Sequence, residues 1–192
     1  MAHEVVSNGV LFMTQAEAPI AQSRDARLRA LVDAHIDATA RVLRRLGVRS
    51  GDVDDAVQQV FLTLARRLDD VEENAERAFL YRTALNVAAH ARRTVARRRE
   101  VDEPSGEGPV STATSAEELV DRRRAAEMLE RVLDAMEDDV REVFVLFEVE
   151  ELSMAEIAEL LSIPPGTVAS RLRRGRTDFQ ERVARLRKGG IK

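Results

Sequence analysis

The chain has 192 residues, of which 44% are hydrophobic and 33% charged, a balance typical of a folded protein. It contains no cysteine, which excludes disulfides, thiolate metal sites and cysteine nucleophiles. Its net charge of −4 argues against a nucleic-acid partner, yet all but Lys188 and Lys192 of its 30 basic residues are arginine. A GC-rich genome and a phosphate-binding role both explain this bias.

Few aromatic side chains are available for a core, since they make up 4% of the chain. Cores must be built from Leu, Val and Ala, which favours an all-α fold. The longest apolar runs, such as 143–147, are shorter than the ~20 residues of a membrane-spanning helix. A secretory signal requires basic residues near its start, but no Lys or Arg precedes Arg24. We therefore expect a cytoplasmic protein with no membrane insertion.

The first half of the chain predicts a three-helix bundle over residues 24–100, preceded by a disordered tail over 1–23. Apolar residues recur at steps of three and four, so that each helix has one apolar stripe. Gly47 supplies a stop after the first helix, and Asp52 suits the N-cap of the second. The expected stripes run over residues 28–46, 53–68 and 79–95.

A flexible acidic linker is expected over residues 101–121. Its first eighteen residues contain two prolines, two glycines and five acids, but no base. Fully extended, they would span about 60 Å at ~3.4 Å each.

The second half predicts another helical unit over residues 122–188, followed by a short tail over 189–192. Ser153 and Glu156 have the spacing of a capping box at the start of a short helix. Two prolines and a glycine within 162–166 separate that helix from a long basic one. This order is the helix-turn-helix arrangement. The expected fold is thus two small helical bundles joined by a linker.

Two basic surfaces are candidates for nucleic-acid binding. Residues 165–188 contain eight bases and two acids, whereas 137–159 contain nine acids and one base. Residues 82–99 contain six arginines and no acid. Arginines on an exposed helix face can contact guanine edges or phosphates, although a solvated helix face has the same pattern. Two such surfaces on joined bundles favour one extended nucleic-acid ligand.

Catalytic and metal-binding patterns are weak. The histidines His3, His35 and His90 are scattered, without a carboxylate or a second histidine at ligand spacing. Asp54 and Asp55 suit the first turn of a helix. The chain has no glycine-rich phosphate loop. We expect no enzyme activity, no cofactor and no metal.

Four motifs resemble conserved parts of bacterial RNA polymerase sigma factors of the sigma-70 family. DDAVQQVFL at 54–62 and FLYRTALN at 79–86 resemble region 2. LSMAEIAELL at 152–161 and PGTVASRLRR at 165–174 resemble region 4. The chain contains these two regions alone, as in the extracytoplasmic-function (ECF, group 4) subfamily.

The resemblance implies a non-enzymatic subunit that directs core RNA polymerase to promoters, as a monomer within holoenzyme. It implies three partners: core polymerase, through the β′ clamp helices and the β flap; promoter DNA; and an anti-sigma factor. The second region-2 helix would dock on the clamp helices. Its polar face carries the candidates Asp54, Asp55, Gln58, Gln59, Thr63 and Arg66, with Arg67 beside them.

The resemblance also assigns DNA contacts. The loop over 71–78 would receive a flipped base of the −10 element, and the third helix would hold the non-template strand. The −10 candidates are Val71, Asn74, Arg77, Arg82, Asn86, Arg92 and Arg93. Region 4 would read the −35 element in the major groove through Thr167, Ser170, Arg171, Arg173, Arg174 and Arg176.

Some residues depart from the family pattern. Gln59 stands where many relatives have Glu, and Ala169 replaces a frequent basic residue. Gly175 stands where Ala is usual, which costs about 1 kcal/mol of helix propensity. Two other interpretations stay open: a stand-alone helix-turn-helix repressor or activator with a dimerising or sensing bundle, and a helical adaptor without a DNA role.

Overall fold

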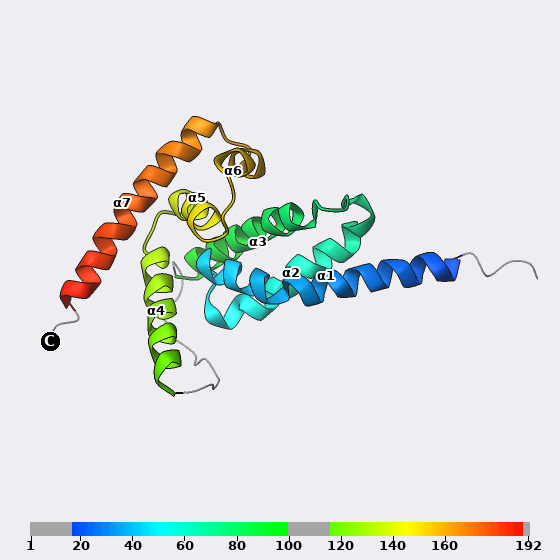
Figure 1. The fold of residues 1–192 in the computed structure, drawn as a ribbon, viewed down its shortest axis with the longest axis horizontal. Coiled ribbons are helices and arrows are strands. Elements are labelled where there is room, and N and C mark those ends of the chain that lie inside the picture. The colour runs from blue at the N-terminus through cyan, green and yellow to red at the C-terminus, as the bar shows by residue number, and fades with distance from the viewer. Residues whose placement is uncertain (1–16, 100–115, 190–192) are drawn as a thin grey trace, which may run out of the picture.

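The computed structural model describes residues 17–99 and 116–189, where every regular element is a helix (Figure 1). In chain order the elements are α1 (Glu17–Arg45), η1 (Ser50–Asp52), α2 (Val53–Arg67), η2 (Leu68–Asp70), α3 (Glu76–Arg99), α4 (Ala116–Asp134), α5 (Asp138–Glu148), α6 (Met154–Leu161) and α7 (Pro165–Gly189). The predicted all-α fold with two helical units is confirmed.

The first unit packs α1, α2 and α3 against one another around aliphatic side chains. Its most deeply buried residues include Leu43, Leu46, Val60, Leu64, Leu68 and Ala88. Gly47 ends the first helix as predicted, with φ 85°, a left-handed conformation that glycine adopts without strain.

Two details of this unit differ from the prediction. Asp52 occupies the N-cap position of α2, but its side chain makes no capping hydrogen bond. Its carboxylate instead binds the Arg49 guanidinium at 2.7 Å. Ile36, expected on the inward stripe of α1, is 40% exposed, so the buried stripe is narrower here than its spacing predicted.

The second unit consists of α4 to α7, with α7 lying along α5. Val168 and Leu172 of α7 are buried against this core. Further along, the rings of Phe144 and Phe179 stack with their centroids 5.1 Å apart. These contacts fix the face that α7 turns outward.

Two predicted boundaries are wrong. Helix α1 begins at Glu17, inside the expected tail, because Pro19 is tolerated in a first helical turn and the neighbouring alanines favour helix. Helix α4 begins at Ala116, inside the expected linker, where Glu117 and Glu118 suit a helix N-terminus. Residues 100–115 of the linker lie outside the described residues.

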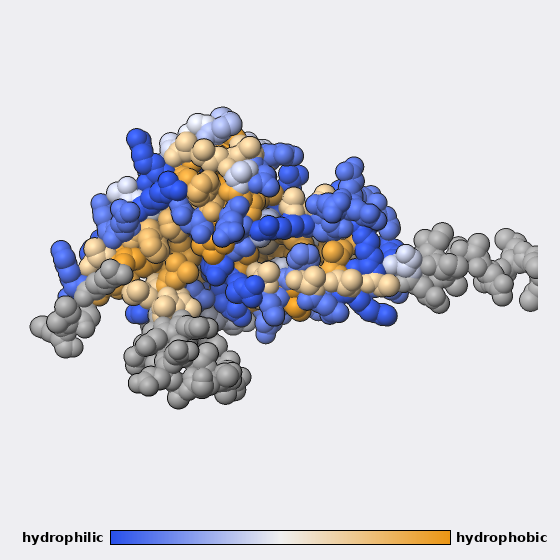
Figure 2. All heavy atoms as spheres, viewed as in Figure 1, coloured by the Kyte–Doolittle hydropathy of each residue, from blue (hydrophilic) through white to orange (hydrophobic). Residues whose placement is uncertain are grey.

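The two units are in direct contact. The sequence predicted only that a linker joins them. Helix α4 packs beside α1, and α6 beside α3 (Figure 1). Buried residues from both units form one continuous hydrophobic cluster. Figure 2 shows hydrophobic atoms mainly in the middle of the visible face, with hydrophilic side chains around its rim.

Candidate nucleic-acid and polymerase interfaces

The capping box predicted at the start of the helix-turn-helix is present. The Ser153 hydroxyl accepts a hydrogen bond from the Glu156 amide at 3.2 Å, and the Glu156 carboxylate accepts one from the Ser153 amide at 2.8 Å. Interactions of the Glu156 carboxylate with the side chain and the backbone amide of Ser153 lower the pKa of Glu156. Ser162 ends α6 in the left-handed conformation, with φ 54°, and α7 starts at Pro165. The turn geometry therefore makes α7 the second helix of a helix-turn-helix.

Close packing at Gly175 explains a departure noted in the sequence. Gly175 is buried, and a Cβ atom there would lie 3.2 Å from Phe144 Cβ and 3.3 Å from Val140 Cγ1. The glycine lets α7 approach α5 more closely than alanine allows. Its unfavourable helix propensity accompanies a tight helix–helix contact.

The exposed face of α7 carries most of the −35 candidates. Ser170, Arg173, Arg174 and Arg176 are exposed, while Thr167 and Arg171 are half-buried. The Ser170 hydroxyl donates to the Thr167 carbonyl at 2.9 Å, so Thr167 and Ser170 already share one hydrogen bond.

Acidic side chains at or next to α5 pair with three of these arginines. Arg171 contacts Asp139 at 3.0 Å, Arg174 contacts Glu137 at 2.6 Å, and Arg176 contacts Glu148 at 2.6 Å. The Arg176 guanidinium also lies 5.3 Å from the Phe147 ring centroid.

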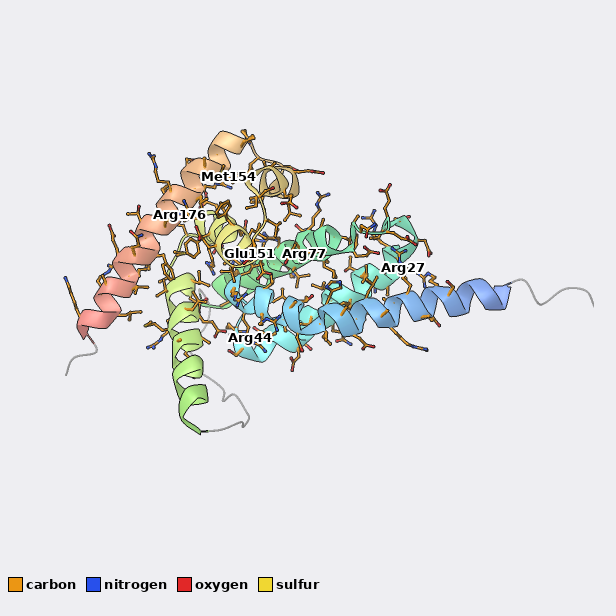
Figure 3. The ribbon with its side chains drawn as sticks, viewed as in Figure 1. Arg27, Arg44, Arg77, Glu151, Met154 and Arg176 are labelled. Atoms are coloured by element: carbon orange, nitrogen blue, oxygen red, sulfur yellow. The ribbon has the colours of Figure 1, made fainter. Side chains whose placement is uncertain are left out.

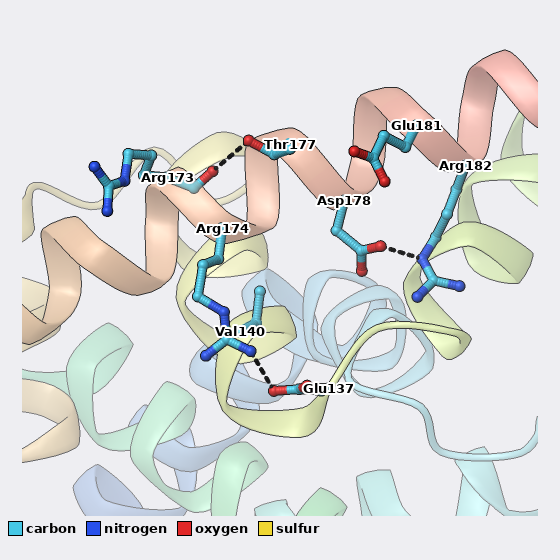
Figure 4. A pocket seen from close by; sticks show the side chains of 8 residues that line it. All are labelled: Glu137, Val140, Arg173, Arg174, Thr177, Asp178, Glu181 and Arg182. Atoms are coloured by element: carbon cyan, nitrogen blue, oxygen red, sulfur yellow. Dashed lines mark hydrogen bonds and ion pairs between the residues drawn. The ribbon is translucent and has the colours of Figure 1, made fainter.

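Arg173 differs from the other three. Within the described part of the chain it is the one −35 candidate arginine without an ion-paired carboxylate. Arg173 and Arg174 border a cavity of about 410 Å³ between the start of α5 and α7 (Figure 4). The Arg173 side chain points away from Glu137, which holds Arg174 (Figure 4).

In the first unit, a groove of about 600 Å³ runs between α2 and α3. It brings together polymerase candidates and −10 candidates that the sequence separates. The lining residues are Gln59, Thr63 and Arg67 of α2, and Phe79, Arg82, Thr83, Asn86, Val87 and His90 of α3. Arg82, Asn86 and His90 are exposed and lie four residues apart on one helix face. That spacing was the signal that could have added His90 to the candidates.

The other polymerase candidates on α2, which are Asp54, Asp55, Gln58 and Arg66, do not line this groove and are exposed. Of the two candidates in the groove, Gln59 is exposed, whereas Thr63 is half-buried and donates to the Gln59 carbonyl at 2.8 Å. Leu62 is 40% exposed on the same helix and was not among the candidates. Its position four residues from both Gln58 and Arg66 was the available signal.

The loop before α3 is held by Arg27 of α1. The Arg27 guanidinium donates to the Val71 carbonyl at 2.7 Å and to the Glu76 carboxylate at 2.9 Å. The hydrogen bond from Arg27 is the main cause of a lowered pKa at Glu76. Asn74 is exposed with φ 73°, but the Val71 side chain is 6% exposed and belongs to the core. Val71 therefore leaves the set of base-contacting candidates.

The other −10 candidates on α3 divide into two groups. Arg93 is exposed, like Arg82 and Asn86. Arg77 and Arg92 instead contact the second unit: Arg77 donates to the Glu150 carbonyl at 2.7 Å, and Arg92 to the Glu142 carboxylate at 2.8 Å. Figure 3 shows Arg77 beside the loop that contains Glu151.

Within the part of the chain that the structure describes, no group of three or more His, Cys, Asp or Glu side chains is arranged to hold a metal ion. None of the helices among residues 17–99 and 116–189 is long and apolar enough to cross a membrane.

The sequence matches two family models, sigma-70 region 2 over residues 31–99 and sigma-70 region 4 over residues 126–179. Over 148 residues it is 32% identical to the ECF RNA polymerase sigma-E factor of Escherichia coli K12, covering 72% of this chain and 78% of that protein. It is 28% identical over 157 residues to the ECF RNA polymerase sigma factor SigE of Mycolicibacterium smegmatis, covering 81% of this chain and 61% of that protein.

Two solved structures share the fold. The sigma factor RpoE of Bartonella quintana, in complex with the anti-sigma factor NepR, superposes with a TM-score of 0.66 at 19% identity, covering 81% of this chain and 96% of that one. CnrH, in complex with the cytosolic domain of CnrY, superposes with a TM-score of 0.64 at 24% identity, covering 87% and 94%. The repressor and adaptor interpretations are not favoured, because region 2 occupies the first bundle. The chain belongs to the ECF family of RNA polymerase sigma factors, which direct promoter-specific transcription.

Proposed function

We propose that this sigma factor binds core RNA polymerase through α2, holds the melted −10 strand along the α2–α3 groove, and reads the −35 element with α7. The observation that carries the proposal is that each family region presents one exposed, arginine-bearing helix face on a buried support. We place this activity in the cytoplasm with polymerase, and it requires no catalysis by the chain itself.

For the −35 element, Arg173 is the principal candidate base reader. Its guanidinium is exposed and, among the described residues, carries no carboxylate that DNA would have to displace. Arg174 and Arg176 sit in exposed ion pairs, which contribute about 0–1 kcal/mol and can yield to phosphates. Arg171 is half-buried against Asp139 and positions the helix instead.

For the −10 element, the groove offers a guanidinium, an imidazole and an amide beside an aromatic ring. Arg82 and His90 flank Asn86, and Phe79 supplies a ring at the same groove. Flipping a base out of the duplex costs a few kcal/mol, which stacking and hydrogen bonds to its edge must offset. Asn86 can both donate to and accept from a base edge.

For core polymerase, the exposed part of α2 combines charge with one apolar side chain. Asp54, Asp55, Gln58 and Arg66 surround Leu62 along the helix. A partly apolar centre with a polar rim is typical of a protein interface. An anti-sigma partner is also proposed, in line with the neighbouring RpoE structure that contains NepR.

Transcription in vitro tests the proposal. Core polymerase with this chain should produce transcripts from a pool of fragmented genomic DNA, and neither component alone should do so. Arg173→Ala should weaken holoenzyme binding to the resulting promoters by about 1–3 kcal/mol. Arg185→Ala is the matched control, since Arg185 is exposed on the same helix outside the candidate set. Absence of any transcript would refute the proposed function, and equal effects of both variants would refute the role of Arg173.

A further inference from the structure

The contact between the two units is centred on Glu150, in the loop between α5 and α6. The Glu150 amide donates to the Val145 carbonyl at 3.0 Å, and the Leu152 amide to the Leu146 carbonyl at 3.0 Å. Between them, Glu151 has φ 58°, a conformation that non-glycine residues rarely adopt. The loop is thus held in a defined shape that presents Glu150 to the first unit.

Three residues of the first unit bind Glu150. Its carboxylate accepts hydrogen bonds from Arg45 at 2.9 Å and from the Tyr81 hydroxyl at 2.8 Å. Its carbonyl accepts one from Arg77 at 2.7 Å, and Arg77 also donates to the Tyr81 hydroxyl at 3.0 Å. The Glu150 side chain is 11% exposed, so the charge-assisted bonds to its carboxylate are shielded from solvent, whereas Arg77 is exposed. Arg77 uses two of its donor groups in this cluster.

A second cluster of contacts between the units surrounds Arg92. Its guanidinium donates to the Glu142 carboxylate at 2.8 Å and to the Leu46 carbonyl, and lies 3.0 Å from the Asp138 carboxylate. The Arg92 side chain is 13% exposed. Asp138 and Glu142 both belong to α5, the acidic helix of the second unit.

Arg141 of α5 also bridges the two units, next to Arg92. It is 4% exposed, and its guanidinium donates to the Met136 carbonyl at 3.1 Å within the second unit. It also donates to the Leu46 carbonyl of the first unit at 3.4 Å. Gly47 makes room for it, because a Cβ atom there would lie 2.0 Å from the Arg141 guanidinium. The two units are therefore complementary in both shape and charge.

We propose that the free chain closes on itself, with Asp138 and Glu142 of α5 acting as an intramolecular competitor for the single-stranded DNA that Arg92 would bind, and with the Glu150 loop holding Arg77. This inference rests on the proposed function for the identity of the displaced ligand. Carboxylates and phosphates compete for the same guanidinium donors, so Arg92 serves one partner at a time. Arg77 donates instead to the Glu150 carbonyl and the Tyr81 hydroxyl, which a phosphate would have to replace. Arg82, Asn86 and Arg93 stay exposed in the closed form, which leaves it weak DNA affinity.

The test uses a variant that opens the contact without touching the DNA-facing side chains. Glu142→Gln with Glu150→Gln removes two carboxylates, and Glu151→Gln with Glu159→Gln is the control with the same charge change. Within the described residues, Glu151 and Glu159 form no side-chain hydrogen bond or ion pair. Since the chain has no cysteine, Ala34→Cys and Ala184→Cys, both exposed and on different units, accept a fluorophore pair.

Energy transfer should fall in the Glu142/Glu150 variant of the free chain and stay at the wild-type level in the control. The variant should also bind a short random-sequence single-stranded oligonucleotide about tenfold more tightly than the control. Adding core polymerase to the labelled wild-type chain should lower energy transfer as well. In holoenzyme we expect the units to be apart, so both variants should transcribe like wild type.

Equal energy transfer and equal oligonucleotide affinity in the two variants would overturn the closed form, as would wild-type energy transfer that does not change on core binding. Circular dichroism of each variant establishes that the helices are intact, and the wild-type measurement with core polymerase needs no substitution in the contact. A wild-type holoenzyme without transcripts would count against the proposed function instead, since energy transfer in the free chain is independent of transcription.

Discussion

Replacing Gly47 with alanine should lower stability through backbone strain and through a clash with Arg141, and the two effects can be measured separately. The residue has φ 85°, and a left-handed conformation costs a residue with a Cβ atom about 1–2 kcal/mol. The new Cβ would also overlap the Arg141 guanidinium, which is 4% exposed and would have to shift. Displacing the guanidinium loses its bond to the Leu46 carbonyl, adding about 1–2 kcal/mol. We expect Gly47→Ala to lower the free energy of unfolding by about 2–4 kcal/mol in total.

A double-mutant cycle isolates the second effect. With Arg141→Ala as the background, the steric conflict is gone and Gly47→Ala should cost only the backbone strain, about 1–2 kcal/mol. Urea unfolding followed by far-ultraviolet circular dichroism measures each of the four chains. A Gly47→Ala effect that agrees within about 0.5 kcal/mol in both backgrounds would show that Gly47 and Arg141 do not meet in solution. The reasoning about contact between the units would then fail.

Three further predictions concern stability. Ser153→Ala removes one half of the capping box and should cost about 1 kcal/mol in urea unfolding, whereas Ser153→Asp should retain most of it. Gly175→Val should cost about 1–3 kcal/mol by overpacking against Phe144, and a neutral result would disprove the close approach of α7 to α5. The lowered pKa of Glu76 stabilises the fold above its ordinary pKa near 4.5, and this contribution is lost as the pH falls through the folded value. The stability difference between wild type and Glu76→Gln should therefore shrink on acidification, and a constant difference would contradict the pairing with Arg27.

Local signals predicted the helices and their faces well. The stop at Gly47 and the capping box at Ser153 and Glu156 depend on neighbouring residues alone, and both are present. Asp52 shows the limit of such reasoning, because it occupies the predicted N-cap position but its carboxylate binds Arg49 instead of the helix amides. The choice between two partners for one carboxylate is a tertiary matter that spacing does not encode.

The candidate sites were predictable as helix faces but not as assemblies. The periodicity of α7 placed Arg173 and Arg174 outward, and both are exposed. It could not distinguish them, since the pairing of Arg174 with Glu137 joins residues 37 positions apart. The contacts of Arg92 with α5 arise from packing between the two units, which no local pattern contains.

Gly175 shows how an unfavourable residue acquired an explanation. In the sequence it was a departure with a cost in helix propensity. In the structure it lies on the buried face of α7, where an added Cβ atom would be 3.2 Å from the Phe144 side chain and a larger residue would force the helices apart. The contact depends on the crossing of α5 and α7, which is a property of the folded unit.

The central claim is that two surfaces on one chain read two promoter elements only in the company of core polymerase. Footprinting of a promoter recovered from the transcription assay tests it most directly, with permanganate to detect unpaired thymines. We expect protection of the −35 element and reactive thymines at the −10 element with core polymerase, and neither with the free chain. Protection of a duplex site by the free chain, without strand opening when core is added, would contradict it.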